Sequence, residues 1–372
     1  MRNFTFKRQL LFVMFMLLGC LSIQAADDGL ITKQITIKLD KAGTLPDRIG
    51  ENQKYLITNL KIVGKINGTD LKFIREMAGS DFNWEKTDGK LSILDLSEAK
   101  IVAGGDAYVR YSDNKYTSND KLGNYVFYGC SGLTSLTIPS SVTSIGDGVF
   151  SGCSGLTSLT IPSSVTSIGK WAFSRCSGLT SMTIPSGVTS IGDQTFDGCS
   201  GLTSLTLPSG VTSIGWYAFL GCSGLTSFTI PSGVTSIGNS AFQACSGLTS
   251  LTIPSGVTSI GESAFSGCSG LTSIYLYPEK SPKLGEYVFD RCAKNCTVYV
   301  PKGTYDDYRS SKFGYFENIV EFDATGIDKV TISTDAKEVS RYSANGQRLS
   351  APAKGFNIVK YSDGSVKKVV VQ

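Results

Sequence analysis

Ten cysteines are the residues of this chain best suited to chemistry, and eight of them recur at one place in a repeated segment. The segment CSGLTSLTIPSSVTSIGDGVF begins at Cys130, and close copies of it begin every 23 residues, with one extra residue before the last. The eight equivalent cysteines are Cys130, Cys153, Cys176, Cys199, Cys222, Cys245, Cys268 and Cys292. Thiols in such numbers form disulfides, bind a metal or fill a core.

The spacing of the thiols favours the third role. Equivalent residues of stacked repeats lie one above another, about 4.8 Å apart, with their side chains pointing the same way. A disulfide needs two Cβ atoms that face each other, and a zinc site needs paired ligands. We therefore predict buried free thiols that act as small apolar core residues. A bridge between Cys292 and Cys296 remains as the alternative for those two.

The chain contains no histidine, which removes the Ser-His and Cys-His nucleophile pairs and the commonest zinc ligand. The regular copies hold few acids, and these stand at positions that vary from copy to copy: Asp147, Asp193, Asp197 and Glu262. Paired carboxylates are therefore a poor basis for catalysis here. We predict a protein that is not an enzyme and has no cofactor and no metal site.

Residues 1–26 have the pattern of an export signal: a basic start, the apolar run QLLFVMFMLLG and the small residues SIQAA. Cleavage near Ala25 or Ala26 is one expectation, and lipidation at Cys20, in Leu17-Leu18-Gly19-Cys20, is the other. Without Arg2, Lys7 and Arg8 of this segment, 35 basic residues become 32, against 31 acidic ones. This near-neutral balance argues against a nucleic-acid binder. Either cleavage or lipidation predicts an exported protein, at the outer membrane, the cell surface or outside the cell, and lipidation at Cys20 would attach it to a membrane.

Each 23-residue copy is too small to bury its own apolar face, so the copies must stack into a solenoid. The pattern L-x-x-L-x-L places two apolar residues on the same side of a short strand, as with Leu136 and Ile138, while Ser135 and Thr137 face the other side. Proline after the strand cannot donate to a ladder and is expected to end it. Phenylalanine, cysteine and a second apolar pair, such as Val142 and Ile145, complete the predicted interior.

The rest of the chain divides around residues 122–325, the regular copies with an aromatic cap. Residues 27–121 contain ITKQITIKL, ITNLKI and LSILDL, which are predicted strands of a degenerate N-terminal part, and TDLKFIREMAG, a predicted helix with its cap at Thr69 or Asp70. A tyrosine-rich insertion follows at residues 103–120. Residues 326–372 are predicted to form a small β domain with turns at Asn345-Gly346 and Asp363-Gly364.

The module I-P-x-x-V-T-S-I-G-x-x-A-F-x-x-C, followed by a leucine strand, closely resembles the BspA-like leucine-rich repeat. The resemblance covers about residues 122–301 and implies an α/β-type solenoid, a right-handed coil with one short parallel strand per repeat. It also implies adhesion to host matrix or plasma proteins such as fibronectin or fibrinogen, or to other bacteria. The segment EVSRYSANGQRLSAPAKGFNIVKYSDGSVKKVVVQ resembles a C-terminal sorting domain of exported bacterial proteins, which implies passage through an outer-membrane secretion route.

A specific binding site needs residues that differ between copies, and the copies differ most after Ile-Gly and after Phe. Periodicity aligns these positions along one ridge, which holds the first candidate binding residues: Trp171, Arg175, Trp216, Tyr217 and Leu220. The second candidates lie in the insertion: Tyr108, Tyr111 and Tyr116. The competing interpretation is that these loop positions are simply unconstrained. The serine and threonine columns of the strands are interpreted as a solvated face.

We therefore expect a non-catalytic, surface-directed repeat protein that binds an extended macromolecule. The leading hypothesis is adhesion to an extracellular protein. The alternative is a surface glycan-binding protein of a carbohydrate uptake system, with Trp171, Trp216 and Tyr217 stacking on sugar rings. A passive coat protein is the third hypothesis.

Overall fold

The computed structural model describes residues 29–323, 338–343, 348–349, 351, 355–361 and 366–371. The export signal with Cys20 and both predicted turns of the C-terminal domain lie outside these residues. The chain forms two compact units, Met1–Phe322 and Asp323–Gln372. In the second unit the described strands are β23 (Glu338–Ser343), β24 (Arg348–Leu349), β25 (Gly355–Tyr361) and β26 (Val366–Val371). They form an antiparallel sheet in the order β24-β23-β25-β26.

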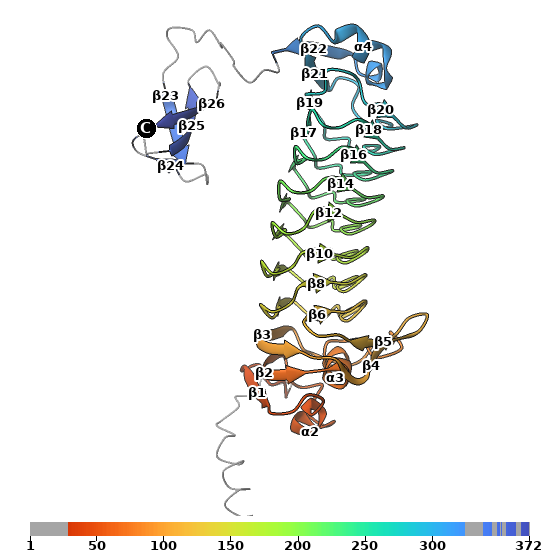
Figure 1. Ribbon diagram of the computed structural model, residues 1–372, viewed down its shortest axis with the longest axis vertical. Helices are drawn as coiled ribbons and strands as arrows, with labels where there is room; N and C mark the ends of the chain where they lie inside the picture. The colour runs from red at the N-terminus through yellow and green to blue at the C-terminus, as the bar shows by residue number, and fades with distance from the viewer. Residues whose placement is uncertain are drawn as a thin grey trace, which may run out of the picture. The chain divides into compact units, whose positions relative to one another are not determined.

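The N-terminal part begins the stack of strands on which the regular copies continue. Its elements are β1 (Ile35–Leu39), α2 (Leu45–Ile49), β2 (Asn59–Ile66), α3 (Gly68–Met77) and β3 (Ile93–Ile101). The three predicted strands are confirmed, and β1, β2 and β3 pair in parallel. The next strand of this sheet is β7 (Ser135–Thr137), the first of the regular copies, with Leu94 opposite Leu136. The degenerate leucine motifs ITNLKI and LSILDL therefore belong to the same solenoid (Figure 1).

The predicted cap of α3 at Thr69 or Asp70 was wrong. The N-cap is Asn67, whose side chain accepts a hydrogen bond from the backbone N–H of Thr69, while the carboxylate of Asp70 accepts from the N–H of Asn67. Asp70 also accepts from the backbone N–H groups of Gly43 at 2.6 Å and Leu45 at 2.9 Å. One carboxylate therefore satisfies donors at the starts of both α3 and α2, which fixes the two helices against each other.

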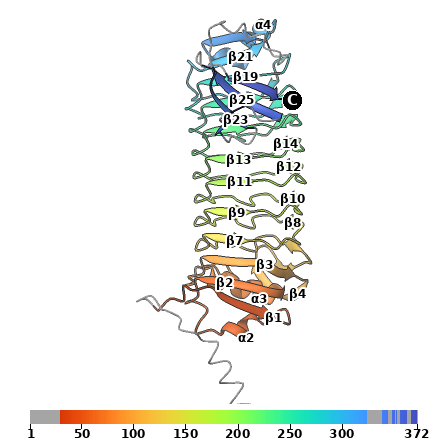
Figure 2. The same ribbon diagram turned by 90° about the vertical axis from the view of Figure 1, so that its left-hand side faces the viewer.

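Each regular copy contributes two short strands rather than the predicted one. The first strands, which contain the leucine motif, are β7, β9 (Ser158–Thr160), β11 (Ser181–Thr183), β13 (Ser204–Thr206), β15 (Ser227–Thr229), β17 (Ser250–Ile253), β19 (Ser273–Leu276) and β21 (Thr297–Pro301). Figure 2 shows the first strands of successive copies lying above one another on one face. Within β9, Leu159 is buried, while Ser158 and Thr160 are exposed, as predicted.

The second strands lie on the return path, where only an apolar edge was predicted. They are β6 (Lys121–Leu122), β8 (Ser144–Ile145), β10 (Ser167–Ile168), β12 (Ser190–Ile191), β14 (Ser213–Ile214), β16 (Ser236–Ile237), β18 (Ser259–Ile260) and β20 (Lys283–Leu284). Two residues are too few for a recognisable alternation, so these strands appear only through pairing between copies. Ile260 pairs with Leu284, which confirms the one-residue expansion before the last copy.

Two columns of side chains fill the core along its length. Phenylalanine rings of consecutive copies stack, as at Phe173, Phe196 and Phe219, whose centroids lie 5.2 and 5.4 Å apart. The eight predicted core cysteines are buried and free. The thiols from Cys153 onward also donate hydrogen bonds, as when Sγ of Cys199 donates to the carbonyl oxygen of Phe173 at 3.1 Å. Cys292 makes the same bond, to Phe265 at 3.2 Å, and is free of the alternative bridge, as is Cys296. The thiol column therefore also ties each copy to the previous one.

The C-terminal end of this unit is closed by the predicted aromatic cap. It consists of α4 (Tyr305–Ser310), the 3-10 helix η1 (Lys312–Tyr315) and β22 (Asn318–Phe322), which pairs with β21. Phe313 and Phe316 are buried against Phe289, the last ring of the phenylalanine column, at 4.9 and 5.1 Å between centroids. The apolar end of the column is thereby removed from water.

Candidate functional site

The five ridge residues predicted from sequence all lie in the turns that follow the second strand of a copy. We call this side of the solenoid, residues 146–152 and their equivalents, the turn ridge. Backbone hydrogen bonds join consecutive turns: the N–H of Trp171 donates to Asp193 at 3.1 Å, and that of Tyr217 donates to Asn239 at 2.9 Å. Trp171 and Tyr217 occupy equivalent positions two copies apart, and Trp216 stands beside Tyr217 in the chain.

Trp171 and Tyr217 have left-handed backbone conformations, with φ of 55° and 56°. Such a conformation costs a residue other than glycine about 1 kcal/mol or more. Ser240 and Ser263 share it at the same place in later copies, and Gly148 occupies it in the first. The strain is therefore a property of the repeat, and aromatic residues occupy this position in four copies, at Tyr125, Trp171, Tyr217 and Tyr287.

Trp216 and Tyr217 are the most exposed of the predicted aromatic residues on the ridge, at 59% and 39%, and Tyr287, which occupies the position of Tyr217 in the last copy and was not predicted, is 67% exposed. Trp171 is half-buried, and its indole Nε1 donates to the side chain of Gln194 in the next copy. Arg175 is exposed, with its stem lying over Gly198, and Leu220 is half-buried. Of the predicted ridge residues, Trp216, Tyr217 and Arg175 are thus the ones free to contact a partner.

Asp193 fixes the backbone that carries Trp216. Its Oδ1 accepts from the backbone N–H of Trp216 at 3.0 Å, and its Oδ2 pairs with the ammonium of Lys170 at 2.9 Å. Partial burial by itself would raise the pKa of Asp193, but the contacts with Lys170 and Trp216 outweigh it and lower that pKa. Its contribution to stability is therefore present above about pH 4 and is lost as the pH falls below that value.

We expect Asp193→Ala to loosen the turn of Trp216 while leaving the solenoid folded. Loss of one charge-assisted hydrogen bond at a partly exposed site should reduce stability by about 1 kcal/mol. Amide exchange at Trp216 should accelerate about fivefold, which mass spectrometry of deuterium uptake would measure. Asp193→Asn retains the acceptor oxygen and is the matched control. Equal acceleration in both variants would contradict the assigned role of the hydrogen bond.

A hollow of about 450 Å³ lies beside Trp216, along the second strands. Serine hydroxyls and one amide line it, from Ser236, Asn239 and Ser259, and Asp193 and Lys283 add one charge of each sign. The site therefore combines an exposed ring with donors and acceptors of both kinds. Periodicity alone indicated Trp216, whereas the hollow depends on how five copies stack.

In the insertion, the prediction for Tyr108 was wrong and the other two tyrosines are exposed. The insertion forms the hairpin β4 (Gly104–Arg110) and β5 (Asn114–Thr117). Tyr108 is 1% exposed, because its ring packs under the hairpin and its hydroxyl donates to the carbonyl of Asn124 at 3.0 Å. Tyr111 and Tyr116 are 50% and 57% exposed. Tyr108 therefore anchors the hairpin to residues 122–129, a half-copy of the repeat that precedes the first full copy.

Tyr111 belongs to an aromatic cluster that the sequence did not predict. Its ring stacks on Trp84 at 5.2 Å and on Tyr125 at 4.4 Å, and Trp84 also lies 4.3 Å from Tyr128. Tyr125 lies in LGNYVFYG, the half-copy at residues 122–129 that matches the end of the repeat, and it occupies the ridge position there. This was the only signal for the cluster that periodicity offered. Trp84 comes from an irregular segment, and only the fold brings it here. The cluster holds the hairpin against the N-terminal end of the turn ridge.

A further aromatic group, on the strand face, was not predicted from the sequence. Tyr275 and Tyr299 continue the outward threonine column, since Thr252 pairs with Tyr275 and Tyr275 with Tyr299. Their rings stack at 4.6 Å, and Tyr277 lies edge-on to Phe322 at 5.4 Å. The replacement of threonine by tyrosine at a repeated position was the available signal.

The stacked copies define the chain as a leucine-rich-repeat solenoid. The model of the BspA type leucine-rich repeat region matches it in six copies, over residues 120–249 and 235–340. The chain belongs to this family, and its members are typically non-catalytic proteins that bind other proteins. No curated protein matches the chain.

Three solved structures are similar to the chain. The T. pallidum leucine-rich repeat protein TpLRR is 28% identical over 45% of this chain and 67% of its own, with a TM-score of 0.32. A leucine-rich cell surface protein of Faecalibacterium prausnitzii is 24% identical over 60% and 86%, with a TM-score of 0.32. The pneumococcal vaccine antigen PcpA is 16% identical over 74% and 82%, with a TM-score of 0.35.

Among the residues that the structure describes, no group of three metal-binding side chains is placed to hold an ion. Within the same residues, no helix has the length and apolar character needed to cross a membrane.

Proposed function

We propose that the chain is an exported, surface-directed adhesion protein that binds an extracellular protein through its turn ridge. The single observation that carries this proposal is the exposed indole of Trp216, which lies beside the exposed Tyr217 at a ridge position where the other copies carry only Asn, Asp, Lys or Glu. Large exposed aromatic side chains are typical anchors of protein interfaces, and arginine such as Arg175 is enriched beside them. Near-identical copies supply a rigid scaffold, and the residues that differ supply specificity.

Export and surface attachment are part of this proposal. The leader at residues 1–26 would direct the chain out of the cytoplasm, by cleavage near Ala26 or by lipidation at Cys20. The second unit, with its four-stranded antiparallel sheet, would serve as the sorting domain that its sequence resembles.

Glycan capture is the second candidate, favoured by the hollow beside Trp216. An exposed indole next to Ser236, Asn239 and Ser259 offers a stacking surface together with hydroxyl and amide partners. A sugar chain needs both features, because its faces are apolar and its edges carry hydroxyls.

Trp216→Ala separates the two candidates in one comparison. The full chain would be assayed on immobilised fibronectin and fibrinogen and on a glycan array. If Trp216 anchors a protein interface, its loss should weaken protein binding by about thirtyfold, or 2 kcal/mol. Trp171→Ala is the matched control, because that ring is half-buried and bonded to Gln194, and it should change affinity less than threefold.

The adhesion proposal would be abandoned if binding appeared only on the glycan array and disappeared with Trp216→Ala. That result would instead establish the second candidate. Absence of binding in both assays would leave the chain as a passive coat protein, which contradicts both.

A further inference from the structure

The hydrogen-bond ladders of the solenoid are interrupted between the second and third regular copies. Within residues 29–323, β9 does not pair with β11 and β10 does not pair with β12, whereas the pairs before and after them do form. The turn ridge remains joined at the same junction, with N–H groups of Phe173 and Arg175 donating to Thr195 and Asp197 at 2.9 and 2.6 Å. The copies are therefore held on the ridge side. On the first-strand side only Thr180 reaches across, its backbone N–H and its hydroxyl each donating to the carbonyl of Thr157 at 3.4 Å, and the strands themselves are unpaired on both sides.

Side-chain size in the core accounts for the opening on the strand face. Met182 stands in the middle of β11, where most copies have leucine, and Phe228 stands at the same place in β15. The ladder is broken directly before each of these strands, between β9 and β11 and between β13 and β15. Phenylalanine is bulkier than leucine, and methionine, although close to leucine in volume, is longer and unbranched, so each packs differently against the neighbouring leucines of the column and shifts the backbone. Ile274, which has the volume of leucine, leaves the ladder into β19 intact.

The spacing of the backbone at Gly192 shows the opening on the second strand face. A Cβ atom added at Gly169 or Gly215 would lie within 2.7 Å of the preceding copy, but one added at Gly192 would meet nothing closer than 3.5 Å. Thr195 is buried where neighbouring copies have alanine, and its hydroxyl donates to the carbonyl of Gly192 at 2.9 Å. The wide backbone spacing at Gly192 and the buried hydroxyl of Thr195 therefore both mark an opening between the second and third copies on the second-strand face.

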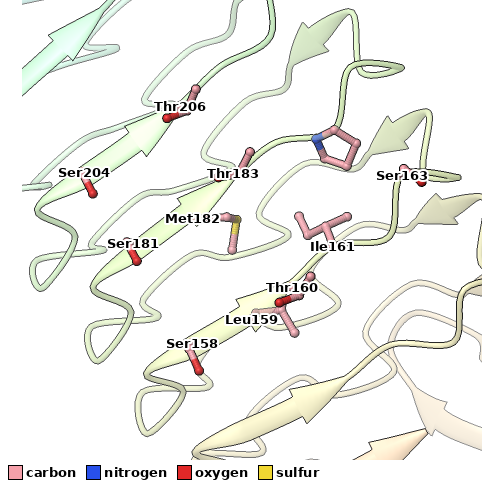
Figure 3. Close-up of a pocket in the computed structure, with 11 residues that line it drawn as sticks. Ser158, Leu159, Thr160, Ile161, Ser163, Ser181, Met182, Thr183, Ser204 and Thr206 are labelled. Carbon is pink, nitrogen blue, oxygen red and sulfur yellow. The ribbon is translucent and has the colours of Figure 1, made fainter. Parts of the chain in front are cut away.

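The opening produces a hollow of about 540 Å³ across β9, β11 and β13, on the first-strand face. Figure 3 shows its outward hydroxyls in two rows, which are Ser158, Ser181 and Ser204, and Thr160, Thr183 and Thr206. None of these six hydroxyls has a hydrogen-bond partner in the described part of the chain, whereas Thr157 and Thr203, in a neighbouring column, donate to backbone carbonyls. None of the residues that line the hollow is charged.

The floor of this hollow is apolar and reaches the core. Met182, Leu159 and Ile161 line it. The side chains beside unpaired strands are also slightly exposed: Leu159 and Leu205 are 7% and 8% exposed, whereas Leu251, whose strand pairs on both sides, is 0% exposed. Strand edges that lack a ladder also leave backbone N–H and C=O groups directed at the gap. The hollow thus offers hydroxyls, backbone donors and acceptors, and an apolar base.

We propose that this open junction, the hollow over β9, β11 and β13, is a binding site for a neutral oligosaccharide. Sugar hydroxyls both donate and accept, which matches the serine and threonine rows and the free strand edges. The C–H face of a pyranose ring lies against Met182 and Ile161. The volume falls in the range of about 300–1,000 Å³ that small-molecule sites occupy. The site does not include Trp216, so it does not depend on the proposed function.

Other ligand classes fit this chemistry less well. A charged ligand would lose hydration without gaining an ion pair, because the lining is uncharged. A protein partner would find no Trp, Tyr or Arg anchor in the hollow. An inserted peptide strand needs about 4.8 Å of additional separation, which the bonds along the turn ridge prevent.

The experiment is a calorimetric titration of the full chain with neutral hexasaccharides of glucose, mannose and xylose, and with uronic-acid oligomers as the charged probes. Binding of a neutral probe, in preference to the charged ones, is expected. Ser181→Ala/Thr183→Val removes two hydroxyls from the centre of the hollow and should weaken binding about tenfold. The matched control is Ser250→Ala/Thr252→Val, the same change in β17, which pairs on both sides and lies outside the hollow. It should change affinity less than twofold.

Met182→Leu tests the origin of the site without removing a polar group. Closing the ladder should slow amide exchange in β11 and weaken oligosaccharide binding, while Trp216→Ala leaves that binding unchanged. No binding of any neutral probe at millimolar concentration, equal losses in the two double variants, or preference for the uronic-acid oligomers would each overturn the proposal. The adhesion assay on immobilised proteins is read separately, so either idea can fail alone.

Discussion

Raising the pH from 7.5 to 10 is expected to unfold the solenoid, because its eight stacked thiols are much weaker acids in the folded state. Burial raises the pKa of Cys130 to about 11 and that of Cys199 and Cys245 to about 12, and the remaining thiols of the column shift in the same direction. In the unfolded chain a thiol ionises near pH 8.5. The stabilisation is therefore complete below about pH 8.5 and is lost as the pH rises toward the folded pKa values.

The size of this effect follows from the number of thiols. Between the two pKa values each thiol removes about 1.4 kcal/mol of stability per pH unit, so eight that unfold together remove roughly 15 kcal/mol by pH 10. That is comparable to the whole stability of an ordinary domain. Urea denaturation followed by circular dichroism at pH 7.5, 8.5, 9.5 and 10 would measure the dependence.

A cysteine-poor variant distinguishes the thiols from other alkaline groups. Replacing Cys199, Cys222 and Cys245 by alanine should lower stability at pH 7.5 by a few kcal/mol, through small cavities and three lost thiol bonds. It should nevertheless reduce the slope of stability against pH by about three eighths, while every tyrosine and lysine remains. A slope equal to that of the unmodified chain would show that the thiols are not responsible.

Much of the fold could be predicted because each copy of the repeat contains the same local sequence features. The alternation around Leu136, the turn after Pro139 and the buried Phe and Cys positions are local features, and periodicity converts each of them into a column. The second strands could not be predicted, because two residues such as Ser144-Ile145 become a strand only through their partners in other copies. The thiol hydrogen bonds are similar, since the acceptor of Cys199 is Phe173, 26 residues away.

The candidate sites were predictable to the extent that they depend on position in the repeat. Trp216 and Tyr217 lie on the ridge where periodicity placed them, whereas Tyr108 was misassigned because an irregular hairpin has no period from which to read burial. The open junction was out of reach for a different reason. Met182 and Phe228 replace leucine by another apolar residue, so the sequence pattern does not change. Their effect on the strand pairing depends on how the side chains of neighbouring copies pack in one column.

Arg75→Met is expected to destabilise the N-terminal end of the solenoid by about 3–5 kcal/mol, because each buried acceptor left without a donor costs about 1–3 kcal/mol. Arg75 of α3 is fully buried and has no carboxylate partner among the residues described. Its guanidinium donates instead to the carbonyls of Tyr125 at 3.0 Å, Val126 at 3.1 Å and Asp81 at 2.9 Å, and to the hydroxyl of Ser80 at 3.1 Å. Methionine fills most of the volume but leaves the carbonyl of Val126 and the hydroxyl of Ser80 without this donor in a dry site, while the carbonyls of Tyr125 and Asp81 keep only the backbone N–H donors of Tyr128 and Trp84. The unmade hydrogen bonds should therefore outweigh the relief of removing a buried charge.

The position of Arg75 makes the effect local and easy to recognise. It joins α3 to the turn that carries Tyr125, and hence to the cluster of Trp84 and Tyr111. Trp84 fluorescence should change at a lower urea concentration than the circular dichroism of the regular copies, because contacts in a solenoid are limited to neighbours. Arg75→Lys retains the charge but reaches fewer acceptors, so an intermediate loss is expected. Arg48→Met is the control, since its ion pair with Asp40 at 3.7 Å is exposed and should contribute less than about 1 kcal/mol. A loss for Arg75→Met no larger than that control would mean that the buried guanidinium bonds contribute nothing beyond their cost of desolvation.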